Sequence, residues 1–90
     1  MKLGNRYSLV NEVDNVRLDV IDGEELIQCR VSQEALAEMA RQYQLETNGN
    51  ALNIAQECFD CLTWLWMKKI RLGTREEDGS ILLRSRDIIC

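Results

Sequence analysis

The sequence predicts a single α+β domain over residues 1–90, with an N-terminal β-hairpin, two antiparallel helices and a C-terminal strand or hairpin. Two alternating segments, 16–21 and 26–31, flank the turn signal Asp22-Gly23, which is typical of a hairpin. Residues 50–73 repeat apolar side chains at helical spacing, in the longest such run of the chain. A hydrophobic fraction of 46% is enough for one modest core. The economical packing is an antiparallel sheet with both helices on one face.

The hairpin is better defined by its buried face than by its register. A two-residue turn would pair Leu18 with Ile27, and a four-residue turn would pair Leu18 with Cys29. Both registers bury the same face, because they differ by two residues. The residues expected on that face are Val16, Leu18, Val20, Ile27, Cys29 and Val31. Before the hairpin, residues 1–12 are expected to form either a flexible lead-in or a short strand.

Two helices are predicted to follow the hairpin directly. Ser32 is a good N-cap for a helix over residues 33–45. Residues 46–49 form a polar turn that is short enough to make the two helices antiparallel neighbours. The second helix is expected to start at Asn50, with Asn48 as the rival cap, and to end at Gly73 in a left-handed conformation.

The C-terminal segment carries a second turn signal, Asp78-Gly79, and then an alternating segment over residues 80–84. Ile81 and Leu83 would share one face of that strand, and Ser85 would cap a last short turn. The elements together predict a core of Val16, Leu18, Ile27, Cys29, Val31, Leu36, Met39, Ala55, Phe59, Leu62 and Trp66.

Charge and hydropathy exclude several classes of protein. The net charge is −4, and the first fifty residues hold nine acidic against five basic side chains. Nucleic-acid affinity comes largely from Lys and Arg contacts with phosphate, so we expect no direct nucleic-acid binding. No run approaches the ~20 apolar residues of a membrane span, and the first residues lack the apolar centre of a signal peptide. A cytoplasmic location without membrane contact is expected.

The chain contains no histidine, which removes the commonest general base and metal ligand. Pairs of a serine or cysteine nucleophile with histidine are therefore impossible within one chain. Neither a glycine-rich phosphate loop nor the spacing of a calcium loop occurs in the sequence. We expect a non-enzymatic protein with no cofactor.

Cys58-x-x-Cys61 is the motif that most resembles a chemical site. In redox proteins the first cysteine of this motif lies at a helix N-terminus, which lowers the pKa of its thiol. Here that cysteine is expected two turns inside a helix. Buried structural cysteines are therefore the favoured interpretation. The alternative function is a cysteine-based redox or metal-binding protein that uses Cys58 and Cys61 together with Cys29 or Cys90.

Two separated parts of the chain resemble a known family. They are Cys29-Arg30-Val31-Ser32-Gln33-Glu34-Ala35-Leu36 and, further along, Lys69-Ile70, Gly73, Asp78-Gly79-Ser80-Ile81-Leu82-Leu83 and Asp87. In this order they resemble the small bacterial domain-of-unknown-function family 1488, over about residues 16–87. The resemblance implies a compact α+β fold and a bacterial or phage origin. It implies no catalytic residue, because the family has no assigned activity.

Trp64 and Met67 break the helical pattern, since both project from the polar side of the predicted second helix. Trp and Met are enriched in the centres of protein interfaces. Asp60, Lys68 and Arg71 would form a polar rim around them. We expect an interface here, in a homodimer or with another protein, and the alternatives are cover by a terminal segment or simple exposure. The favoured function is a small acidic protein-interaction module, such as a phage- or plasmid-borne inhibitor or adaptor.

Overall fold

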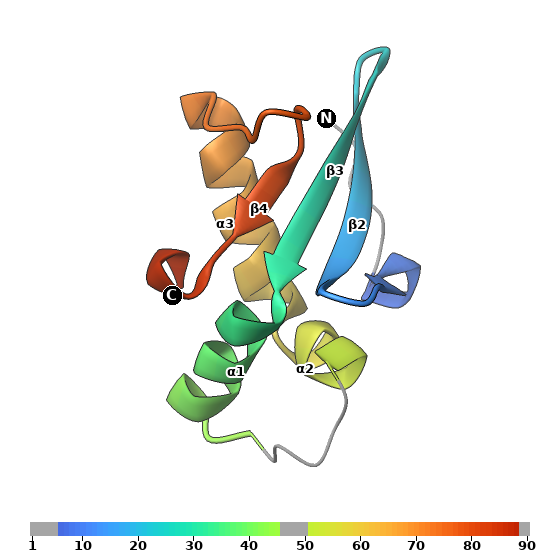
Figure 1. Ribbon diagram of the computed structural model, residues 1–90. Coiled ribbons are helices and arrows are strands. Elements are labelled where there is room, and N and C mark those ends of the chain that lie inside the picture. The colour runs from blue at the N-terminus through green and yellow to red at the C-terminus, as the bar shows by residue number, and fades with distance from the viewer. Residues whose placement is uncertain (1–5, 46–50, 89–90) are drawn as a thin grey trace.

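A computed structural model describes residues 6–45 and 51–88 and shows an α+β domain (Figure 1). Within these residues the sheet contains four strands and is accompanied by three α-helices and two single 3-10 turns. In chain order the elements are η1 (Arg6–Ser8), β1 (Val10–Asn11), β2 (Asn15–Asp22), β3 (Glu25–Ser32), α1 (Gln33–Gln42), α2 (Ala51–Glu57), α3 (Phe59–Leu72), β4 (Ile81–Leu83) and η2 (Ser85–Asp87).

The sheet is mixed, so the expected antiparallel sheet is wrong in one respect. Its strand order is β1-β2-β3-β4, and the first three strands are antiparallel neighbours. β4 pairs in parallel with β3, with Cys29 opposite Ile81 and Val31 opposite Leu83. A parallel neighbour needs a long crossover, and the whole helical part of the chain lies between β3 and β4. The C-terminal segment forms this single strand rather than a second hairpin.

The β2–β3 hairpin adopts one of the two predicted registers, with Leu18 opposite Cys29. Asp22 and Glu25 also pair, so the loop between the strands contains only Gly23 and Glu24. The four-residue turn expected with this register is therefore wrong, and the two-residue turn lies one residue later than the predicted Asp22-Gly23. Gly23 has φ +66°, a conformation that glycine adopts without strain. β1 pairs only with residues 16–17 and β4 only with residues 29–31, so the far end of the hairpin extends beyond both neighbours.

Ser32 caps α1 as predicted, because its hydroxyl accepts a hydrogen bond from the amide of Ala35 at 3.1 Å. The helix ends at Gln42, earlier than expected, where the chain turns through Gln44 with φ +56°. The turn predicted at residues 46–49 and the caps predicted at Asn48 and Asn50 lie outside the described residues.

The single long helix predicted from residue 50 to 73 is instead two helices, α2 and α3, which meet at Cys58. Cys58 has φ −101° and ψ 22°, which departs from helical geometry. α2 packs against α1 and β2, whereas α3 packs against β4. A helical wheel cannot show this division, because it comes from two different packing partners. The predicted end is confirmed, since Gly73 closes α3 with φ +72°.

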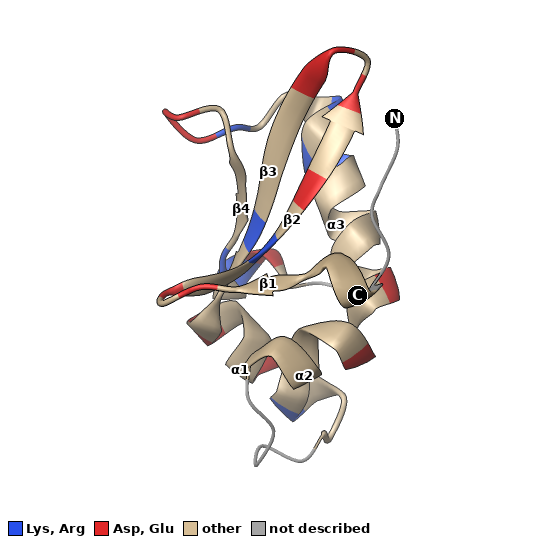
Figure 2. Ribbon diagram, turned by 90° about the vertical axis from the view of Figure 1, so that its right-hand side faces the viewer, with Lys and Arg blue, Asp and Glu red and all other residues tan. Residues whose placement is uncertain are grey.

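The helices lie on one side of the sheet, in two places. In Figures 1 and 2, α3 runs along one face of the strands, and α1 and α2 lie near the end where β3 leads into α1. The expectation of two helices side by side on one face is therefore only partly met. The opposite face carries the exposed side chains of Asp19, Ile21, Leu26 and Gln28.

The core contains nearly every residue predicted for it. Phe59 is the exception, since it is only partly buried at the start of α3. Further core residues are Leu9, Val20, Ala35, Cys58, Leu65, Ile81, Leu83 and Ile88. Trp66 is fully buried, and its indole Nε1 donates a hydrogen bond of 2.9 Å to the carbonyl of Arg30 in β3.

Leu62→Ala should lower the free energy of unfolding by about 2–5 kcal/mol, because Leu62 is fully buried and the truncation leaves a cavity. Phe59→Ala removes more atoms but should cost less than the ~3–5 kcal/mol typical of a fully buried phenylalanine. Urea denaturation of both variants measures the two losses. A larger loss for Phe59→Ala than for Leu62→Ala would show that Phe59 belongs to the centre of the core.

Candidate interaction surfaces

The outer face of α3 carries all five residues predicted to form an interface. Trp64 is 50% exposed, although it is an indole in the middle of a well-packed helix. Asp60, Lys68 and Arg71 are exposed around it, and Met67 is partly buried at one side. We define these five residues as the α3 outer face. Their role as an interface stays a prediction.

Lys68 lies over Trp64, with its Nζ 5.3 Å from the centroid of the indole ring. This cation–π contact holds both side chains in a defined arrangement on the helix surface. Within residues 6–45 and 51–88, neither Lys68 nor Arg71 makes an ion pair. The face therefore offers an aromatic ring beside two cations whose charge is not neutralised by a described carboxylate.

The cysteines are arranged differently from the prediction. Cys58 is the N-cap residue of α3 rather than a residue two turns inside a helix. It is nevertheless a buried free thiol, and its pKa is raised by burial and then by the charge of Glu57. Cys61 is disulfide-bonded, so the two cysteines of the C-x-x-C motif are not joined to each other. Cys90 lies outside the described residues.

Burial also raises the pKa of the Cys29 thiol, to about 12, with a further contribution from Asp19. Both free thiols are thus held in the neutral form, which is a poor nucleophile and a poor metal ligand. The described residues contain no group of three or more His, Cys, Asp or Glu side chains placed to hold a metal ion. Cys29 and Cys58 thus fit the structural interpretation, whereas the expectation that Cys61 is a reduced, buried cysteine is wrong, because Cys61 forms a disulfide.

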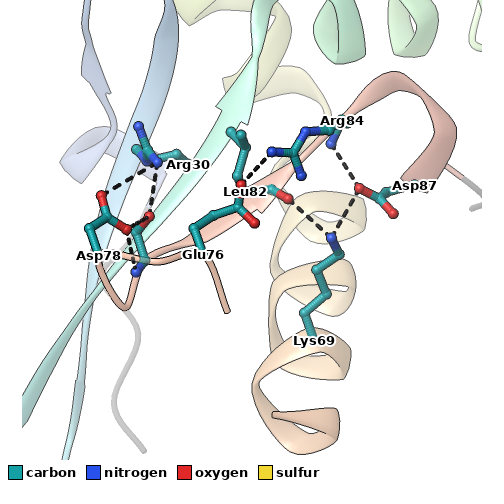
Figure 3. Close-up of polar contacts among 8 residues, drawn as sticks. Arg30, Lys69, Glu76, Asp78, Leu82, Arg84 and Asp87 are labelled. Carbon is teal, nitrogen blue, oxygen red and sulfur yellow. Dashed lines mark hydrogen bonds and ion pairs between the residues drawn. The ribbon is translucent and has the colours of Figure 1, made fainter. Parts of the chain in front are cut away.

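A polar cluster fixes β4 and the segments on either side of it (Figure 3). Lys69 Nζ donates to the carbonyl of Leu82 at 3.1 Å and to the carboxylate of Asp87 at 3.0 Å. The amide of Arg84 donates to the same carboxylate at 2.9 Å. Lys69 therefore occupies the outer edge of β4 and ties it to α3. No such role was predicted for Lys69, since only the fold brings it to Leu82 and Asp87.

The second half of this cluster joins the 73–80 loop to the sheet. Arg30 Nη2 donates to the hydroxyl of Ser80 at 2.9 Å and lies 3.7 Å from the carboxylate of Asp78. Arg84 donates to Glu76, and that hydrogen bond is the main reason why the pKa of Glu76 is lowered. Arg30 and Ser80 are 50 residues apart in the chain, so no local motif indicates their contact.

No protein-family model, no curated protein and no solved structure matches the chain. The resemblance to the domain-of-unknown-function family 1488 therefore stays a prediction. Among the described helices, none is long and apolar enough to cross a membrane.

The Asp87 carboxylate should make the free energy of unfolding decrease at acidic pH. Burial alone would raise its pKa, but hydrogen bonds from Arg84 and Lys69 and the charges of Lys69 and Arg86 outweigh burial and lower the pKa. A lowered pKa in the folded state means that the contribution is complete above the usual value of 3.8 and is lost as the pH falls through the folded-state pKa. Asp87→Asn should therefore lower the free energy of unfolding at neutral pH. On acidification, the free energy of unfolding should fall by less in this variant than in wild type. Urea titrations at several pH values test this, with the exposed Asp14→Asn as the matched control.

The free thiols should react slowly in the folded protein. With a pKa near 12 instead of 9.0, Cys29 has a thiolate fraction about a thousandfold smaller at pH 8. Iodoacetamide labelling followed by peptide mass spectrometry should therefore find Cys29 and Cys58 modified only after denaturation. Rapid labelling of Cys58 in the native protein would contradict the structural interpretation and support the redox alternative.

Proposed function

We propose that the protein is a non-enzymatic interaction module that binds a protein partner through the α3 outer face. The observation that carries the proposal is the half-exposed indole of Trp64 in the middle of a helix whose other side is firmly buried. A tryptophan at the centre of an interface often supplies 2 kcal/mol or more of binding free energy. The charged side chains of Asp60, Lys68 and Arg71 supply the polar rim that such an interface needs.

A second copy of the chain is the partner that the order of charges fits best. Asp60 precedes Trp64 by four residues and Lys68 follows it by four residues. In an antiparallel pair of α3 helices with a two-fold axis at Trp64, the carboxylate of Asp60 would lie opposite the amine of Lys68 in the other copy. The same contact occurs twice, as an isologous interface requires. Met67 would extend the apolar centre.

The same face also suits a wider role as an inhibitor or adaptor that acts on another protein. Lys68 and Arg71 would then favour an acidic patch on that protein, because complementary charge steers association and suppresses wrong partners. The absence of histidine and the buried free thiols support a non-enzymatic role. Sedimentation of the isolated chain separates the two partners, since only the homodimer forms without another protein.

Trp64→Ala should leave the chain folded and weaken self-association at least tenfold, because half of the indole is outside the core. Leu26→Ala is the matched control, since Leu26 is 59% exposed on the face of the hairpin opposite the helices. Analytical ultracentrifugation measures association, and circular dichroism checks folding. A folded Trp64→Ala variant that associates like wild type would remove the α3 outer face from the interface.

A charge exchange tests the antiparallel arrangement itself. Asp60→Lys and Lys68→Asp should each weaken the homodimer, because each places like charges opposite one another in both contacts. A mixture of the two variants should restore association, since lysine then faces aspartate in both contacts. If the mixture associates no better than either variant alone, the helices do not meet in this arrangement.

A further inference from the structure

A row of four side chains crosses the open face of the sheet, on the side away from α3. The register places Val10 opposite Arg17, Arg17 opposite Arg30, and Arg30 opposite Leu82. Val16 and Leu18 on either side of Arg17 are buried beneath the sheet, and so are Cys29 and Val31 beside Arg30. The two arginines therefore project from the open face as direct cross-strand neighbours, with an apolar residue at each end of the row. Figure 2 shows basic segments of β2 and β3 side by side near the base of the hairpin.

Two like charges opposite one another in a sheet cost free energy, so the pair needs compensation. Arg17 lies 3.5 Å from a carboxylate oxygen of Glu12 and 3.3 Å from one of Asp19. Arg30 lies 3.7 Å from Asp78. These carboxylates offset the charge, but they leave most of the guanidinium hydrogen atoms unused.

The unused donors are the central observation. Each guanidinium has five N–H groups. Within residues 6–45 and 51–88, the one hydrogen bond donated by either group runs from Arg30 to Ser80. The Nε atoms of both arginines are buried and make no hydrogen bond in that part of the chain, although Arg17 Nε is the atom that lies 3.3 Å from Asp19. A ligand would therefore have to meet the terminal Nη groups. Both side chains keep about a quarter of their surface exposed, at 26% for Arg17 and 25% for Arg30.

We propose that the Arg17–Arg30 pair binds a carboxylate of a partner protein, in a segment where Asp or Glu stands between apolar side chains. Two adjacent guanidinium groups match the planar, two-oxygen geometry of a carboxylate and bind it by parallel charge-assisted hydrogen bonds. Val10 is 44% exposed, and with Leu82 it offers apolar contacts on either side of that carboxylate. This surface lies on the opposite side of the sheet from the α3 outer face, so the proposal is independent of the one for α3.

The surrounding charge favours a single carboxylate over a nucleic acid. Glu12, Asp19 and Asp78 border the arginine pair, and the chain carries a net charge of −4. A row of phosphates would meet these carboxylates, whereas one carboxylate between apolar side chains reaches only the two guanidinium groups. The exposed apolar residues near the pair match such a segment of protein better than they match a sugar–phosphate backbone.

The test uses the whole chain labelled with ¹⁵N and two peptides, acetyl-Gly-Val-Glu-Val-Gly-amide and its twin with Gln in place of Glu. The Glu peptide should shift the Nε–H resonances of Arg17 and Arg30, and the Gln twin should need at least a tenfold higher concentration for the same shift. Arg17→Gln and Arg30→Gln should each weaken binding of the Glu peptide roughly tenfold. Arg41→Gln, which removes one exposed cation on α1, should leave binding unchanged.

Arg30→Lys tests whether the planar guanidinium group is needed or a positive charge alone is enough. This variant should weaken binding although the charge is retained. The proposal fails if the Gln twin binds as well as the Glu peptide, if Arg41→Gln weakens binding as much as the changes at the pair, or if neither peptide shifts the two resonances. Inorganic phosphate that displaces the peptide at an equal concentration would show a general anion site and overturn the assignment to a carboxylate. Self-association of the wild-type chain that disappears in Arg17→Gln would make a second copy the occupant instead.

Discussion

The burial of Trp66 fixes how α3 lies on the sheet. Its indole is fully enclosed, and Nε1 donates to the carbonyl of Arg30, so a rotation of α3 about its axis would both open the core and leave a buried donor without its acceptor. Residues two apart on an α-helix point about 200° away from each other, because each residue turns the helix by 100°. Once Trp66 faces the sheet, Trp64 must face outward. The exposed indole is therefore a consequence of packing, and the fold cannot bury it without giving up Trp66.

The same helix also protects the edge of the sheet. A short outer strand exposes backbone groups that can pair with another chain, and a lysine on such an edge discourages that pairing. Lys69 follows Trp66 by three residues and reaches the carbonyl of Leu82, while Asp87 holds its amine from the other side. One face of α3 thus packs against the core and, through Lys69, occupies a backbone carbonyl of the edge strand β4. Association through side chains on the faces of the molecule is consequently favoured over association through β4.

The parts of the fold that sequence predicted depend on local spacing. Alternation identified the inner face of the hairpin, and Ser32 was correctly identified as the cap of α1 because the cap bonds only three residues ahead. The parallel pairing of β4 was missed, since Ile81 and Leu83 would show the same alternation in either direction. The break at Cys58 was missed because a helical wheel assumes one straight axis. The pairing of Arg17 with Arg30 depends on the hairpin register, which the sequence left open between two alternatives.

Arg30 connects the two proposed surfaces through a single residue. Its carbonyl accepts the hydrogen bond from Trp66 on the helical side, and its side chain belongs to the arginine pair on the open side. Because the sheet is one strand layer thick here, a ligand at Arg17 and Arg30 and a partner at Trp64 would lie on opposite sides of the same β3 backbone. Close-packed protein interiors deform little, so the separation between the two surfaces should change little when either is occupied. The two proposed contacts would thus be made on opposite sides of the sheet, which is the arrangement that the proposed adaptor role would need.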